Sequence, residues 1–133
     1  MPDETCINGY YGEDFIRYIN AYAKQGRSLL PGSKVLIAPY GTKLLKADDT
    51  YVAQLERIDV DMVAYQDEVG VRKAKPTETG AYFEALRRAH DRAGRSALWA
   101  DVELFDFEGE PYRSALIPAD MDRVIKQLES FSP

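Results

Sequence analysis

The sequence predicts an α/β fold built from four successive units, each a strand followed by a helix. Three observations support this prediction. Strand-like and helical patterns alternate along the whole chain, no linker or change in composition interrupts them, and the 133 residues are 45% hydrophobic, which suits one globular domain with a core. Strands that alternate with helices pair in parallel through right-handed crossovers. We therefore treat residues 1–133 as a single α/β domain.

Each element follows from a local pattern. Strands are expected where β-branched, aromatic or continuous apolar residues gather, at residues 5–11 (TCINGYY), 34–40 (KVLIAPY), 61–69 (DMVAYQDEV) and 97–105 (ALWADVELF). Helices are expected where apolar residues recur three or four positions apart, at residues 14–29, 48–58, 76–93 and 118–131. Asp48 can cap the second helix, Gly94 lies just past the third, and Pro118 suits the first turn of the fourth.

The last expected strand combines a buried-strand composition with two carboxylates. Successive side chains of a strand point to opposite faces, so one face is wholly apolar and the other carries Trp99, Asp101, Glu103 and Phe105. Leu104, on the apolar face, is expected to supply core packing. The acidic face then lines a polar cavity or, alternatively, lies in solvent as the face of an edge strand.

Acidic residues follow three of the four expected strands. Glu13 and Asp14 follow the first strand, and the third and fourth strands end in the pairs Asp67 with Glu68 and Asp101 with Glu103. An open doubly wound sheet and a (β/α)₈ barrel both fit alternating units, but barrel enzymes place their chemistry at the carboxyl ends of the strands. A whole barrel takes about 250 residues. We therefore expect a partial, half TIM-type barrel with four parallel strands in sequential order and helices outside.

Composition excludes several classes of function. The net charge is −5, with 22 acidic and 17 basic residues spread along the chain, so no basic stripe favours nucleic acid. No apolar run approaches the roughly 18 residues of a membrane span, and no signal segment is evident at the N-terminus. Cys6 is a lone cysteine, and no cluster has metal-ligand spacing, so neither a metal nor a cofactor is expected. His90 is expected on a solvated helix surface.

Four blocks in order resemble a bacterial TIM-barrel family of glycoside hydrolases, most of them uncharacterised. The blocks are GYYGE (9–13), LIAPY (36–40), AYQDEVGV (64–71) and LWADVELF (98–105), and they match about strands four to seven of that barrel. One departure is Glu68, which stands where the family usually has Gly. The resemblance implies a fragment of a longer barrel, or a chain that completes its barrel with a second copy. The sequence leaves the cellular location open, and the resemblance favours an extracytoplasmic one.

The resemblance implies cleavage of a glycosidic bond by two carboxylates. In this sequence the positions that match the family's catalytic acid and nucleophile are Glu13 and Glu103. The structural alternative for Glu13 is a first-turn helix acid favoured by the helix dipole, and for Asp14 it is an N-cap.

Other polar and aromatic residues near the strand ends are expected to bind a carbohydrate rather than to react with it. Acids and aromatic rings suit a ligand with hydroxyl groups and apolar ring faces. Gln66 has the parity of the barrel interior, whereas Val63 and Tyr65 have the parity of the side that packs on helices. A core amide is equally consistent for Gln66, and Asp67 could instead orient the next turn by an Asx bond. The alternative function is a non-catalytic carbohydrate-binding or self-assembling half-barrel. The expected substrate-binding residues are Asp67, Gln66, Asp101, Trp99, Tyr40 and Tyr11.

Overall fold

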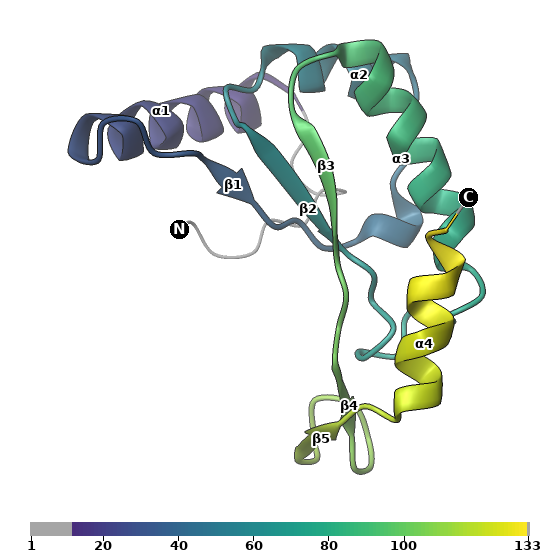
Figure 1. Cartoon of the computed structure of the whole chain (residues 1–133). Coiled ribbons are helices and arrows are strands. Elements are labelled where there is room, and N and C mark those ends of the chain that lie inside the picture. The colour runs from purple at the N-terminus through teal and green to yellow at the C-terminus, as the bar shows by residue number, and fades with distance from the viewer. Residues whose placement is uncertain (1–11, 133) are drawn as a thin grey trace.

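The computed structural model describes residues 12–132 (Figure 1). The expected strand at 5–11, with Cys6 and Tyr11, lies outside these residues. Four α-helices, one 3₁₀ helix and five strands follow along the described chain. They are α1 (Glu13–Leu29), β1 (Leu36–Ile37), η1 (Thr42–Leu44), α2 (Asp49–Arg57), β2 (Met62–Gln66), α3 (Thr79–Ala93), β3 (Ala97–Asp101), β4 (Phe105–Phe107), β5 (Leu116–Pro118) and α4 (Met121–Ser130).

A three-stranded parallel sheet of order β1-β2-β3 forms the centre of the described chain. Its register pairs Ile37 with Val63 and Gln66 with Asp101, so the last residues of β2 and β3 lie side by side. The prediction of consecutive parallel strands is confirmed for these three. Gln66 and Asp101 therefore stand at the carboxyl edge of the sheet, where loops can build a site.

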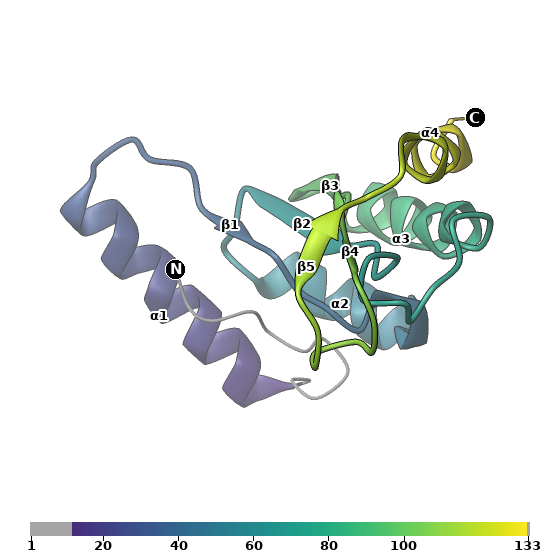
Figure 2. The ribbon, with the colours of Figure 1, turned by 90° about the horizontal axis from the view of Figure 1, so that it is seen from below.

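Helices α1, α2 and α3 lie on one side of the sheet (Figure 2). Val63 and Tyr65 of β2 are fully buried against them, as strand alternation predicted, and Tyr65 makes edge-to-face contacts with Phe83 and His90 of α3. The alternate residues of β2, Ala64 and Gln66, point to the opposite side of the sheet. This division leaves one face for the core and one face for a site.

His90 is part of that core, so the expectation of a solvated His90 was wrong. Its side chain is 5% exposed, Nδ1 lies 2.9 Å from the carbonyl oxygen of Ser96, and Nε2 lies 2.9 Å from the Tyr65 hydroxyl. Tyr65 in turn shares a hydrogen bond with the Tyr51 hydroxyl of α2. Burial lowers the pKa of His90. A neutral imidazole with both nitrogens satisfied joins α2, β2 and α3 in place of a surface charge.

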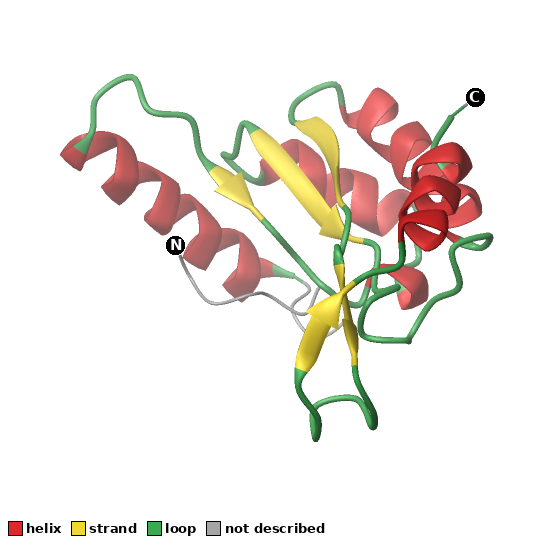
Figure 3. Ribbon diagram, turned by 60° about the horizontal axis from the view of Figure 1, so that its bottom comes forward, coloured by secondary structure: helices red, strands yellow, loops and turns green. Residues whose placement is uncertain are grey.

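A hairpin that the sequence analysis did not predict follows β3 (Figure 3). The expected strand 97–105 ends at Asp101, and β4 and β5 then pair antiparallel, with Phe105 opposite Pro118. An antiparallel pair was not part of the expected all-parallel arrangement. Pro118 is the last residue of β5 rather than the first turn of a helix, and α4 begins at Met121 with Asp120 as its cap. The hairpin projects beyond the carboxyl edge of the sheet (Figure 1).

Leu104 does not pack into the core, because the strand alternation stops at Asp101. Its side chain is 62% exposed, whereas the side chain of the neighbouring Glu103 is 8% exposed. The side chains at the centre of the core come instead from the helices and β2, among them Ile19, Leu55, Val63 and Leu86. Two other expectations are confirmed: Asp48 caps α2 through the backbone N–H of Tyr51, and Gly94 closes α3 in a left-handed conformation.

These positions predict opposite responses to the same truncation. Leu86→Ala should lower the free energy of unfolding by about 2 to 5 kcal/mol, because Leu86 is 1% exposed and its removal leaves a cavity. Leu104→Ala should change it by no more than about 0.5 kcal/mol, because Leu104 lies at the surface. Urea denaturation of both variants measures the difference. A large loss of stability in Leu104→Ala would contradict the placement of Leu104.

Candidate functional site

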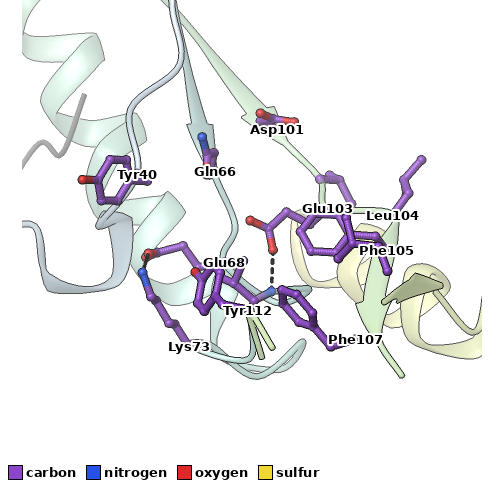
Figure 4. A pocket seen from close by; sticks show the side chains of 13 residues that line it. Tyr40, Gln66, Glu68, Lys73, Asp101, Glu103, Leu104, Phe105, Phe107 and Tyr112 are labelled. Atoms are coloured by element: carbon purple, nitrogen blue, oxygen red, sulfur yellow. Dashed lines mark hydrogen bonds and ion pairs between the residues drawn. The ribbon is translucent and has the colours of Figure 1, made fainter. Parts of the chain in front are cut away.

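A pocket of about 1100 Å³ opens at the carboxyl edge of β2 and β3 (Figure 4). One part of its wall comes from the ends of these strands and the loop after β2, and another part comes from the hairpin. The side chains divide into a polar group and an apolar group. The lining residues are Tyr40, Gln66, Glu68, Val71, Lys73, Asp101, Val102, Glu103, Leu104, Phe105, Phe107, Tyr112 and Leu116.

Gln66 and Asp101 reach the pocket because they are the paired last residues of β2 and β3. Burial raises the pKa of Asp101, and the nearby charge of Asp67 raises it further. Within residues 12–132, the carboxyl of Asp101 accepts no hydrogen bond. Asp101 is therefore a pocket carboxyl whose oxygens remain available to a ligand.

Glu103 is a buried carboxyl of the pocket wall. Its Oε2 accepts a hydrogen bond from the backbone N–H of Val71 at 2.9 Å, and the backbone of Gly70 also bonds to it. Burial raises the pKa of Glu103 despite these bonds, and the charges of Asp67 and Glu68 add to the effect. A carboxyl in such surroundings keeps its proton to higher pH than usual.

Gly70 allows this contact by having no side chain. A Cβ at this position would lie 2.6 Å from the carbonyl oxygen of Phe105 and 2.9 Å from Oε2 of Glu103. Any larger residue would push the loop after β2 away from Glu103. The absent side chain is thus a steric requirement of the site.

Asp67 lies beneath the pocket rather than on its wall. Its side chain is fully buried, and Oδ1 accepts hydrogen bonds from the backbone N–H groups of Val69 at 3.2 Å and Glu103 at 3.3 Å. Oδ2 accepts a hydrogen bond from Nε2 of Gln127 in α4. The bond to Val69 is the Asx turn that the sequence left open as an alternative. Burial raises the pKa of Asp67 more than these hydrogen bonds lower it.

Glu68 occupies a left-handed backbone conformation, with φ at 58°. Glycine adopts this conformation with little strain, so the Gly that the resemblance led us to expect here would suit the backbone better than Glu. The Glu68 side chain offsets the strain through its own contacts. It is buried, and its two oxygens accept hydrogen bonds from the backbone N–H groups of Gly41 at 3.1 Å and Lys43 at 3.3 Å. Glu68 therefore joins the loop after β1 to the loop after β2.

Tyr40 and Lys73 stand together on the pocket wall. The ammonium group of Lys73 lies 5.6 Å from the centre of the Tyr40 ring and 3.8 Å from Oε1 of Glu68. Lys73 is the one basic side chain among the lining residues. Three carboxyls against one ammonium group make this wall acidic.

The structure does not bring Glu13 to this pocket. Glu13 is the first residue of α1, its side chain is exposed, and it forms a salt bridge with Arg57 of α2 with an Nη1 to Oε1 distance of 2.5 Å. The hydrogen bond from Arg57 lowers the pKa of Glu13. These contacts match the structural alternative of a first-turn helix acid. Asp14 does not cap α1 either, because it is the second helical residue and pairs with Arg17.

Trp99 has the parity of the pocket face but does not line the pocket. It pairs with Ala64 in the register of β2 and β3, two residues before Asp101, and is 53% exposed. Tyr11 lies outside the described residues. Within residues 12–132, no group of three or more metal-ligating side chains comes together.

The sequence analysis missed the residues that hold the site together. Gly70, Arg72, Gln127 and the hairpin residues Phe107, Tyr112 and Leu116 were not identified. The segment 105–118 carried a signal for the hairpin, because FDF and ALIP flank a turn-like EGEP. No local signal links Gln127 to Asp67, because 60 residues separate them.

A model of the family "Domain of unknown function (DUF4434)" matches residues 6–133. The chain belongs to this family. No curated protein matches its sequence. Among solved structures, the chain is similar to the crystal structure of a protein described as a putative alpha-L-fucosidase from Bacteroides thetaiotaomicron, with a TM-score of 0.72 and 20% sequence identity.

That similarity covers 98% of this chain and 43% of the crystallised chain. At this identity the similarity shows the fold alone, and the chain spans less than half of that neighbour's length. In the described part of this chain, no helix combines the length and apolar character needed to cross a membrane.

The buried carboxyls predict how stability depends on pH. Burial raises the pKa values of Asp67 and Glu103 above their values of 3.8 and 4.5, so each favours the folded state when protonated. Their contribution to stability is complete below the pKa that each carboxyl has in the unfolded chain. It is lost as the pH rises through the pKa that the carboxyl has in the folded chain. Asp61 acts in the opposite direction: its pKa, lowered to about 2 chiefly by the backbone N–H of Val35, makes it stabilising except in strong acid.

We therefore expect the free energy of unfolding to fall less in Asp67→Asn than in the wild type as the pH rises from about 4 to about 7. The new amide can keep the acceptor bonds to Val69 and Glu103. Its nitrogen meets Nε2 of Gln127, so the Gln127 amide must turn over and present Oε1, which has no partner in the described structure, as the acceptor. Denaturant titrations across this pH range measure the slope, with Asp122→Asn as a matched loss of one exposed carboxyl. An unchanged slope in Asp67→Asn would contradict a raised pKa at Asp67.

Proposed function

We propose that this chain supplies the acidic and aromatic part of a glycoside hydrolase site at the carboxyl edge of a TIM-type barrel. The three parallel strands in consecutive order, the helices on one side of the sheet and the similarity to part of a larger chain support the barrel. The neighbour's description as a putative alpha-L-fucosidase supports the reaction class. The pocket itself supports a carbohydrate, because carboxyls and aromatic rings line it together.

One observation carries the proposal: Glu103 is a buried carboxyl with a raised pKa on the wall of this pocket. Such a group can remain protonated and act as a general acid. In the proposed reaction, Glu103 gives its proton to the glycosidic oxygen as the bond between that oxygen and the anomeric carbon breaks. The bond from the Val71 backbone N–H to Oε2 holds the carboxyl in place, and in the proposed reaction Oε1 meets the substrate.

Asp101 is the second carboxyl of the proposed reaction, in place of Glu13. It lies on the same wall as Glu103 and accepts no hydrogen bond from residues 12–132. Asp101 either bonds to the anomeric carbon and is later displaced by water, or takes a proton from the water that attacks that carbon. The two routes differ in stereochemical outcome, which NMR of the released sugar distinguishes.

Glu103→Gln tests this assignment. The amide retains an oxygen for the N–H groups of Val71 and Gly70 but has no proton acidic enough to donate, so hydrolysis should fall by a factor of about 100 or more. The melting temperature should stay close to that of the wild type. Glu129→Gln, at an exposed position on α4, is the matched control and should hydrolyse normally. Normal hydrolysis by Glu103→Gln would contradict the assignment of Glu103 as the acid.

A non-catalytic carbohydrate-binding function is the second candidate, and one observation favours it. Glu13, which matches the family's acid position, forms a salt bridge with Arg57 outside the pocket, so only one of the two expected catalytic residues lies there. Isothermal titration and product analysis on the same oligosaccharides separate the two functions. A binding module would bind sugar without releasing product, whereas Glu103→Gln in a hydrolase would bind sugar and lose only turnover.

The exposed inner face of the sheet supports an assembly with further strands. Trp99, on the inner face of β3, is 53% exposed, and exposed apolar surface favours association. β3 is also an edge strand of the described sheet, and an uncovered edge favours pairing with another strand. We expect the 133-residue chain by itself to form a dimer or larger assembly through this face.

Light scattering at tens of micromolar measures the assembly. Trp99→Asp should shift the chain toward monomer, because it places a charge on the face proposed to be covered. Tyr18→Asp is the matched control, since Tyr18 has the same 53% exposure on α1. A wild-type chain that is monomeric, or a Trp99→Asp variant that assembles like the wild type, would rule out association through this face.

A further inference from the structure

The hairpin supplies much of the apolar side of the pocket. Leu104, Tyr112 and Leu116 are 62%, 67% and 61% exposed, and all three line the same cavity. Large apolar side chains scattered over a surface need no explanation, but a group of them on one pocket wall indicates a binding surface. In Figure 4 the labelled hairpin rings of Phe107 and Tyr112 lie on the side of the pocket away from Gln66 and Asp101.

The rings of the hairpin form a connected set. Tyr112 packs on Phe107 with ring centres 5.3 Å apart, and Phe107 packs edge-to-face on Phe105 at 6.0 Å. Phe107 is buried, so it anchors the set, whereas most of the Tyr112 ring is exposed. Tyr112 also has a left-handed backbone, with φ at 62°. An exposed ring held at a strained position indicates a functional constraint on where the ring lies.

Arg72 ties the hairpin to the loop after β2. Its Nε donates to Oδ1 of Asp106 at 2.9 Å and its Nη1 to the carbonyl oxygen of Gly109 at 2.7 Å, and its Nη2 donates to the carbonyl oxygen of Phe107. Arg72 has a left-handed backbone as well, with φ at 59°. Three bonds in one fork fix β4 and the start of the turn against the loop after β2, which a lysine, with a single ammonium nitrogen, cannot reproduce.

The carboxyls of the pocket restrict the charge of the ligand. Glu68, Asp101 and Glu103 line the pocket with only Lys73 to balance them, and the Lys73 ammonium group already lies near Glu68 and over the Tyr40 ring. An anionic ligand would meet carboxyls without a free cation among the lining residues. A neutral pyranose can direct its hydroxyls to the carboxyls and its apolar ring face to the hairpin.

We propose that the β4–β5 hairpin, held in place by Arg72, is the specificity element of the site, and that Tyr112 stacks on the apolar face of a neutral sugar unit. The inference rests on the proposed carbohydrate function and adds the class of sugar and the residues that select it. Tyr112 is the ligand-contacting residue. Arg72 is a positioning residue that acts through the hairpin.

The test uses calorimetric binding of neutral gluco-, manno-, galacto- and fuco-oligosaccharides, and of a galacturonate oligosaccharide matched in length to the galacto-oligosaccharide. Tyr112→Ala should weaken binding of the preferred neutral sugar about two- to tenfold, the range expected for loss of one ring contact. Tyr112→Phe should bind like the wild type, because stacking needs the ring and not the hydroxyl. The galacturonate oligosaccharide should bind more weakly than its neutral counterpart.

Arg72→Lys should weaken binding to a similar extent as Tyr112→Ala while the melting temperature stays close to that of the wild type. Where turnover is measurable, KM should rise and kcat should hold, because the reacting carboxyls are untouched. Arg113→Lys is the matched control in the same hairpin, since Arg113 contacts only the exposed Glu110 side chain among the described residues. It should bind like the wild type.

Three other outcomes would contradict either this inference or the proposed function. If the wild type binds a neutral sugar but Tyr112→Ala and Arg72→Lys bind it equally well, the hairpin is not the specificity element and the proposed function stands. Preference for the galacturonate oligosaccharide overturns the assignment of a neutral sugar. If the wild type neither binds nor hydrolyses any of these sugars, the proposed function fails and this inference fails with it.

Discussion

One buried carboxyl, that of Asp67, joins the ends of β2 and β3 to α4 beneath the pocket. It follows β2 directly, bonds to the backbone N–H of Glu103 after β3, and accepts a hydrogen bond from Gln127 of α4. Its charge also raises the pKa values of Asp101 and Glu103, two of the three pocket carboxyls. A buried charge is costly unless it is hydrogen-bonded, so the bonds to Asp67 fix the positions of the strand ends. The charge of Asp67 also makes Asp101 and Glu103 hold their protons more strongly.

The loop after β2, which lines part of the pocket, has unusual backbone conformations. Glu68 and Arg72 both have positive φ, and each offsets its strain with side-chain bonds to a different neighbour: Glu68 to the loop after β1, and Arg72 to the hairpin. Between them, Gly70 lets the backbone approach Glu103. Strain of this kind persists only where surrounding contacts fix it, and here those contacts border the pocket.

Strand alternation predicted part of this arrangement from the sequence. Val63 and Tyr65 lie in the core, and Gln66 lies on the pocket wall, because β2 keeps a regular extended backbone through Gln66. The same rule failed at Leu104 because β3 ends at Asp101, after which the consecutive residues Val102 to Phe105 all line the pocket. His90 was misplaced because its partners, Tyr65 and Ser96, come from other elements. Contacts between segments distant in sequence, such as Asp67 with Gln127, leave no local pattern to detect.

The most direct test of the account is the pKa of the Glu103 carboxyl, measured by side-chain NMR titration of the wild type and of Asp67→Asn. The account predicts a value above the ordinary 4.5 in the wild type, because burial disfavours the charged form and Asp67 adds a like charge. It predicts a lower value in Asp67→Asn, where that charge is absent. A Glu103 carboxyl that titrates at or below 4.5 and does not respond to Asp67→Asn would contradict it.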